Sequence, residues 1–364
     1  MTIIVCGYTR NLKEKIDYTQ IMADLKKEQG SFQNGKIIDS EGNELDDISP
    51  KRKYEKPELN HQNYELTLDD FYKSTFYLCD SGISVGDNLA YIDNYTKVDT
   101  IDLKIYEPNF NGYFFHSYQS IKFESKVAIA FAGNVNLAKL CISYIKDHLE
   151  KLRISRSDAR PIEYIVRKHC DKDNPLFNNP ESTIWDENLF VDYDESKLYT
   201  AAQISDFIEH SINAAYERIR KNLNALKTNT NIKEKDIIAE FAVTIFCPNK
   251  NKNKNKNEIY IYRPQFIENE YSVPNSKLIA EKTLLPENQI AILGTQKITQ
   301  MLEKQYLTLL TELKNPQKEL FNSVNQYIEE QIGQCIFNVN LPSYYFQFSQ
   351  RKGLETISTN KPRP

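Results

Sequence analysis

The segment from residue 126 to residue 152 constrains the fold most, because it joins an apolar run to an amphipathic run through one glycine. Residues 126–133 read KVAIAFAG, the pattern of a buried strand, and the following NLAKLCISYIKDHLEKL has apolar residues at helical spacing. A strand, a glycine turn at Gly133 and a helix are therefore expected in that order. A second strand enters a glycine turn at residues 291–295 (AILGT).

Further runs rich in β-branched and aromatic residues predict other strands. The first of them is TIIVCGY at residues 2–8, at the very start of the sequence. Additional strands are expected at 74–79, 95–105, 112–118, 239–248 and 257–264 and near 335–348, and helices at 200–227, 296–313 and 316–331.

Two polar segments interrupt this pattern, and we interpret both as insertions. One spans about residues 10–70 and is highly charged, and the other spans about 152–197 and is rich in Pro, Asn and Asp. The prediction is a single domain over residues 1–348 with these two insertions, followed by a flexible tail at 349–364.

The charge of the chain argues against nucleic acid as a partner, because a net charge of -4 gives no basic excess. No stretch reaches the ~20 consecutive apolar residues that a membrane helix needs, and the start lacks a charged leader before an apolar core. We therefore expect a cytoplasmic protein with no membrane partner.

Six cysteines are scattered without a C-x-x-C pair and are interpreted as buried reduced thiols. His169, Cys170, Asp171 and Asp173 lie close together, but no second ligand pair at tetrahedral spacing accompanies them. A polar surface loop is the better interpretation, so neither a metal nor a cofactor is predicted.

Four short motifs follow one another along the first third of the chain. They are the Met-Thr start, D-S-x-I-S-x-G from Asp80, T-K-V around Lys97 and F-A-G-N around Gly133. Their order resembles that of proteasome β-type and bacterial proteasome-like peptidase subunits, members of the N-terminal-nucleophile (Ntn) hydrolase superfamily. The resemblance implies an α+β fold, a four-layer αββα sandwich of two sheets between helical layers.

Carried over motif by motif, the resemblance implies a nucleophile at Thr2 after removal of Met1, with Asp80, Lys97 and Gly133 around it. Thr295, after the second glycine turn, stands where the family has a serine. The chain departs from the family in three ways: the spacing from Asp80 to Lys97 is one residue longer, Gly82 stands where an arginine is common, and the distal aspartate has no clean match, Glu329 or Glu330 being nearest.

The chemistry of these residue types fits such a site without reference to the family. A threonine hydroxyl needs a base within hydrogen-bond reach, and a free α-amino group with a pKa near 8 can serve. Lys97 would act as a cation that lowers the proton affinity of the amine and hydroxyl, Asp80 would hold Lys97, and the Gly133 N–H would stabilise the oxyanion.

The chain is therefore predicted to be an amide-bond hydrolase, and in particular a threonine peptidase acting on peptides or proteins. Two alternatives stay open: a non-catalytic subunit that serves assembly or binding, and an amidase for non-peptide substrates. The resemblance further implies a homo-oligomeric ring, with an ATPase or another unfoldase as a possible partner.

Overall fold

The computed structural model describes two main sheets and four helices among the residues whose placement is defined. The described residues are 2–9, 31–33, 36–38, 74–81, 83–84, 90–92, 95–111, 114–156, 164–172, 199–225, 238–247, 256–267, 277–295, 298–311, 316–333, 343–349 and 352–360. Most of the predicted insertion at 10–70 lies outside them, as does residue 1.

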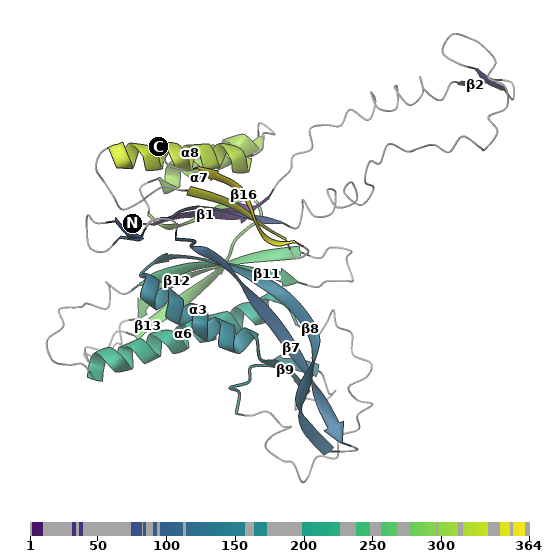
Figure 1. Cartoon of the computed structure of the whole chain (residues 1–364), viewed down its shortest axis with the longest axis vertical. Helices are drawn as coiled ribbons and strands as arrows, with labels where there is room; N and C mark the ends of the chain where they lie inside the picture. Colours follow the sequence, from purple (N-terminus) through teal and green to yellow (C-terminus); the bar gives the residue numbers. More distant parts are fainter. Residues whose placement is uncertain are drawn as a thin grey trace.

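The smaller main sheet is antiparallel throughout and contains the N-terminal strand. Its order is β14–β1–β4–β15–β16, so β1 lies between β14 and β4. Figure 1 labels β1 and β16 of this sheet. The strands are β1 (Ile3–Tyr8), β4 (Thr75–Asp80), β14 (Ile290–Gly294), β15 (Ser343–Ser349) and β16 (Gly353–Asn360).

The larger main sheet has seven strands in the order β10–β9–β7–β8–β11–β12–β13. Every pair is antiparallel except β7 with β9. The strands are β7 (Val98–Asn111), β8 (Phe114–Gly133), β9 (Leu152–Arg156), β10 (Tyr164–Arg167), β11 (Ala239–Cys247), β12 (Lys256–Ile267) and β13 (Lys277–Leu284). Two small hairpins, β2 (Ser31–Gln33) with β3 (Lys36–Ile38) and β5 (Ile83–Ser84) with β6 (Ala90–Ile92), complete the described strands.

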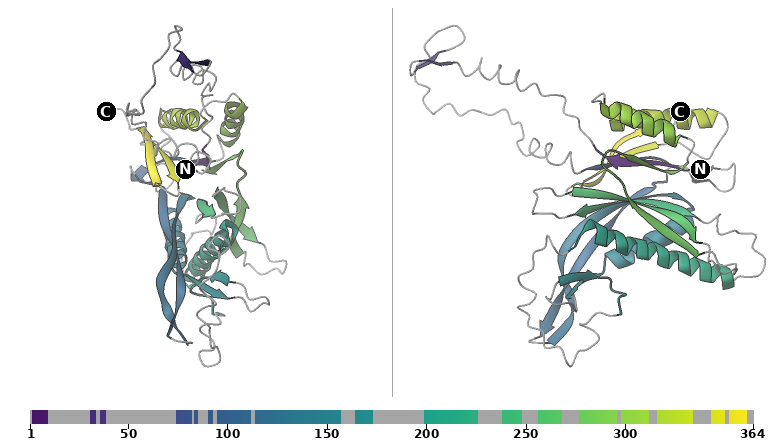
Figure 2. Two further views of the ribbon diagram at one scale, coloured as in Figure 1. Left: turned by 90° about the vertical axis from the view of Figure 1, so that its right-hand side faces the viewer. Right: turned by 180° about the vertical axis from the view of Figure 1, so that it is seen from behind.

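Three apolar cores hold these elements together. The alternation of β1 divides its side chains between two of them: Ile3 and Val5 join helices α7 (Thr299–Thr311) and α8 (Pro316–Gly333), whereas Ile4 and Cys6 face the seven-stranded sheet. The third core lies between that sheet and helices α3 (Val135–Leu149) and α6 (Ala201–Ala225). Figures 1 and 2 show α7 and α8 over one sheet, and α3 and α6 over the other.

The α+β fold class is confirmed, and most predicted elements occur within a few residues of their expected positions. The predictions at 112–118 and 126–133 fall within one continuous strand, β8. The expected flexible tail differs from the structure, because Gly353–Asn360 forms β16 and pairs with β15. Residues 152–156 and 164–167, placed in the second insertion, instead add β9 and β10 to the larger sheet.

Three of the cysteines, Cys6, Cys79 and Cys141, are buried free thiols, as expected. Burial raises the pKa of each thiol to about 12, so all three are protonated. Cys170 differs from the prediction, since it is free but exposed. Among the described helices, none is both long enough and apolar enough to cross a membrane.

Candidate active site

The antiparallel pairing of β1 with β4 brings Asp80 to the start of the chain. Ile4 lies opposite Cys79, so the next residue of β4 reaches the position beside Ile3. There the backbone N–H of Ile3 donates to Asp80 Oδ1 at 2.8 Å. The strand that leaves Thr2 and the strand that returns thus place a buried carboxylate next to Thr2.

Lys97 precedes β7 and connects this carboxylate with the Thr2 hydroxyl. Its Nζ lies 2.8 Å from Asp80 Oδ2 and donates to Thr2 Oγ1 at 3.2 Å. The Lys97 and Asp80 side chains are only 1% and 0% exposed. Two charges so fully removed from water are stable only as a pair, so Asp80 fixes both the position and the charge of Lys97.

Both predicted glycine turns have backbone angles that favour glycine. Gly294 has a φ of 87°, and a Cβ added there would lie 2.1 Å from the Thr2 carbonyl oxygen and 3.3 Å from Ala132 Cβ. Gly133, next to Ala132, has a φ of 102°, and its added Cβ would lie 2.4 Å from the carbonyl oxygen of Ile238. Because neither glycine carries a side chain, the end of β14 approaches the Thr2 backbone closely at Gly294, and the end of β8 approaches Ile238 closely at Gly133.

Thr295, the fifth predicted residue, is buried and connects to the helices above the sheet. Its side chain is hydrogen-bonded to Tyr327 on α8. Burial raises the pKa of Tyr327, and the hydrogen bond from Thr295 opposes that rise. Thr299 Oγ1 donates to the Thr295 carbonyl at 3.4 Å. Thr295 thus adjoins Gly294 in sequence, while these hydrogen bonds tie it to α7 and α8.

The two residues considered for the distal aspartate lie on the exposed face of α8. Glu330 accepts a hydrogen bond from Gln326 at 3.0 Å, one turn earlier in the same helix. Glu329 lines a groove between α8 and the β15–β16 hairpin. The contacts of neither residue join it to Thr2, Asp80 or Lys97.

Two polar residues beside the predicted constellation were not identified from the sequence. Glu240 of β11 lies opposite Ala132, and its Oε2 accepts the Gly294 N–H at 2.8 Å. Ser81 is fully buried after Asp80, and its hydroxyl has no hydrogen-bond partner among the described residues. The sequence could have pointed to Glu240, because it is the only charged residue in the apolar run AEFAVTIFC.

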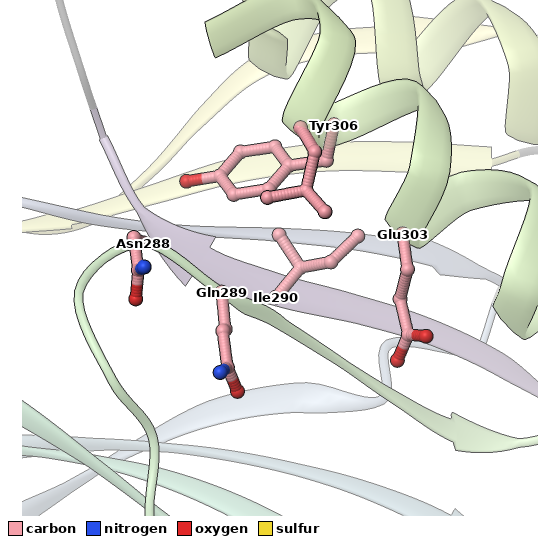
Figure 3. A pocket seen from close by; sticks show the side chains of 6 residues that line it. Asn288, Gln289, Ile290, Glu303 and Tyr306 are labelled. Carbon is pink, nitrogen blue, oxygen red and sulfur yellow. The ribbon is translucent and has the colours of Figure 1, made fainter.

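Figure 3 shows a hollow at the other end of β14, lined by Asn288, Gln289, Ile290, Glu303, Tyr306 and Leu307. Ile290 begins this strand and Gly294 ends it, so the hollow lies about 13 Å along β14 from the Thr2 contact. It contains none of the predicted site residues. A group that could hold a metal lies elsewhere, where His148, Cys170 and His210 meet beside the seven-stranded sheet.

Geometrically, the chain is an α+β protein with a buried lysine–aspartate pair against the threonine that precedes its first strand. No family model and no curated protein matches it. Its fold is similar to solved structures of Anbu from Hyphomicrobium sp. strain MC1 (10% identity, 79% of this chain and 82% of that chain, TM-score 0.33) and of a mutant of that protein (9%, 79% and 82%, 0.36). Anbu, an ancestral beta-subunit, from Yersinia bercovieri is also similar (10%, 80% and 85%, 0.35).

These comparisons correct the resemblance drawn from the motifs. These three solved structures are of Anbu proteins, a proteasome-like but distinct family, and not of the proteasome β-type or bacterial proteasome-like peptidase subunits that the motif order indicated. The motif order misled because short strand, turn and helix signals describe local geometry that several families share. The chemistry of the site therefore has to follow from its own contacts.

Proposed function

We propose that the chain is an amide-bond hydrolase, most specifically a threonine peptidase, in which Thr2 is the nucleophile once Met1 has been removed. One observation carries the proposal: Lys97 Nζ lies within hydrogen-bond distance of both Thr2 Oγ1 (3.2 Å) and Asp80 Oδ2 (2.8 Å). A threonine with no chemical role does not need a buried cation beside its hydroxyl. A hydroxyl that must lose its proton gains from one, because the charge stabilises the developing alkoxide.

The base in this proposal is the α-amino group that removal of Met1 creates. Its reference pKa near 8 leaves a fraction of it neutral at cellular pH, and Lys97, paired with Asp80, lies beside the hydroxyl. The amine takes the proton from Thr2 Oγ1 as the oxygen attacks the substrate carbonyl, and the proton then passes to the leaving amine. Water hydrolyses the resulting acyl ester and restores the hydroxyl.

Gly133 is the proposed oxyanion donor through its backbone N–H, at the turn between β8 and α3. Thr295 is proposed to support the site through its sequence neighbour Gly294, which touches the Thr2 backbone. The three apolar cores, one between the sheets and one under each helix pair, support the predicted four-layer αββα arrangement.

Several other expectations from the sequence stay predictions. They are the single domain over residues 1–348, the homo-oligomeric ring, the ATPase or other unfoldase partner, the absence of nucleic-acid and membrane partners and the cytoplasmic location. They bear on how a substrate would reach Thr2, not on the bond that Thr2 would cleave. A peptide or protein substrate is proposed because the attacked group in this mechanism is an amide carbonyl.

The test combines intact mass with a probe for N-terminal nucleophiles. Purified protein is expected to lack Met1 and to form one adduct with a peptide epoxyketone, which reacts with a hydroxyl and a neighbouring free amine. Thr2→Ser keeps the hydroxyl and should keep the adduct, whereas Thr2→Val keeps the shape and should lose it. Peptide hydrolysis by Thr2→Val should fall by at least about 100-fold.

Three results would separate the alternatives. Retention of Met1 in the purified protein, or wild-type turnover by Thr2→Val, contradicts the mechanism. A protein that lacks Met1, assembles and yet neither reacts with the probe nor turns over favours the non-catalytic subunit. Turnover of simple amides by a Thr2-dependent reaction that ignores peptides favours the non-peptide amidase.

A further inference from the structure

Three potential metal ligands from distant parts of the sequence meet beside the seven-stranded sheet. His148 lies at the C-terminal end of α3, Cys170 follows β10, and His210 lies in α6. Helices α3 and α6 lie side by side against that sheet (Figure 1), which brings the two imidazoles together. Imidazole and thiolate are the ligand types that zinc prefers in proteins.

The separations of the ligand atoms fit one metal ion. Cys170 Sγ lies 3.3 Å from His148 Nε2 and 3.8 Å from His210 Nε2. Tetrahedral zinc with Zn–N of about 2.0 Å and Zn–S of about 2.3 Å places its nitrogen and sulfur ligands about 3.5 Å apart. The three ligand atoms all lie within 4.8 Å of one another, so rotamer adjustments alone can close the site.

The hydrogen bonds of Ser211 fix the tautomer that a metal ligand requires at His148. Ser211 Oγ donates its one proton to the Phe207 carbonyl at 2.7 Å, so it can only accept from His148 Nδ1, 2.8 Å away. The proton of the neutral His148 ring is therefore on Nδ1, and the lone pair of Nε2 points at Cys170 Sγ. Such an outer hydrogen bond is a regular feature of metal-binding histidines.

Cys170 and His210 are exposed, and of the three ligands only His148 is buried. The His148 side chain is 6% exposed.

The charges around the cluster are largely paired. Lys168 lies 3.4 Å from Asp171, and Lys151 bonds Asp147, so the nearby cations are neutralised by carboxylates. His169 packs beside His148, with ring centroids 5.3 Å apart, and directs its Nε2 to Asp147 at 3.3 Å. The cluster supplies three of the four ligands of a tetrahedral zinc ion, and water is the usual fourth ligand of such a set.

We propose that His148, Cys170 and His210 form a zinc site. The bound ion would link α3, the segment after β10 and α6, elements that already meet through apolar contacts and the hydrogen bond between His148 and Ser211. His148 lies near the opposite end of α3 from Gly133, which is about 22 Å along the helix axis. The site is thus separate from Thr2 and holds whether or not Thr2 is a nucleophile.

The test measures metal binding by the full chain. Protein stripped with a chelator is expected to bind one Zn²⁺ per chain by calorimetry, and Co²⁺ in its place should give a thiolate-to-cobalt absorption band in the near ultraviolet. Cys170→Ser should abolish that band, and His210→Ala should remove stoichiometric binding. Ser211→Ala, which removes only the orienting hydroxyl, should weaken zinc binding by about 10- to 100-fold.

His116→Ala is the matched control, because His116 is an exposed histidine on β8 outside the cluster. It should bind zinc as the wild type does. Cys170 and His210 are exposed, so their variants should keep the wild-type circular dichroism spectrum in the absence of metal. No saturable zinc binding by the wild type, or undiminished binding by Cys170→Ser, overturns the proposal. Rapid alkylation of Cys170 that zinc does not slow does the same, and indicates a reactive thiol instead.

Discussion

At the scale of single residues, the pair of Lys97 and Asp80 leads to the first prediction. Asp80→Ala leaves the ammonium of Lys97 in a position that is 1% exposed, with no carboxylate beside it. Removing one partner of a buried ion pair costs about 3–5 kcal/mol, so the free energy of unfolding should fall by that amount. Urea denaturation followed by circular dichroism measures the change.

A double variant provides the control for this experiment. Asp80→Ala combined with Lys97→Met removes both charges and should recover part of the loss, since no charge is then buried alone. Recovery stays incomplete because the Ile3 N–H also loses its acceptor, Asp80 Oδ1. If the double variant is no more stable than Asp80→Ala, the cost does not come from the unpaired lysine.

Gly294 leads to the second prediction, with Gly353 as its matched control. Both have a positive φ, 87° and 74°, where a non-glycine residue costs about 1–2 kcal/mol. An added Cβ meets nothing within 4 Å at Gly353, but meets the Thr2 carbonyl oxygen at 2.1 Å at Gly294. Gly294→Ala should therefore destabilise the protein more than Gly353→Ala and displace Thr2, so that only the first loses reaction with the epoxyketone. Equal loss of stability in the two variants, in the same urea assay, contradicts the close approach at Gly294.

At the scale of the elements, the start of α3 leads to a third prediction. Asn134 is the N-cap, and its side chain accepts the Leu137 N–H at 3.0 Å. Asn134→Ala leaves that donor unsatisfied and should reduce the free energy of unfolding by about 1 kcal/mol, whereas Asn134→Asp, which can still accept, should cost much less. The denaturation midpoints of the two variants show whether the loss comes from the missing cap or from the missing side chain. Equal midpoints contradict a stabilising role of Asn134 as the N-cap.

The elements that could be predicted from the sequence are those whose side chains are buried in a regular pattern. The buried run in β1, the strand–glycine–helix unit around Gly133 and the amphipathic α6 all have such patterns. The strand β16 was missed because its burial is mixed: residues 356–358 are exposed, so its composition resembles a tail. Its place in the sheet comes from pairing with β15, which a local pattern does not encode.

At the scale of the whole molecule, the candidate site was predictable only where its residues fall in motifs. Asp80 reaches the start of the chain through the pairing of β4 with β1, whereas Lys97 precedes β7 of the other sheet, and both residues lie in motifs that the sequence displays. Glu240 reaches Gly294 through a contact between the two main sheets, which joins residues far apart in the sequence. The proposed zinc ligands meet through the packing of α3 on α6. Such contacts depend on tertiary packing, which spacing along one chain does not reveal.

The position of β14 beside β1 has a consequence for the order of events during synthesis. Thr2 lies against Gly294, which a ribosome adds roughly 290 residues later. At about 5–20 residues per second, this interval lasts about 15–60 s. Throughout it, the edge of β1 that pairs with β14 has no partner strand. The removal of Met1 that we propose therefore has this interval in which β14 does not yet cover Thr2.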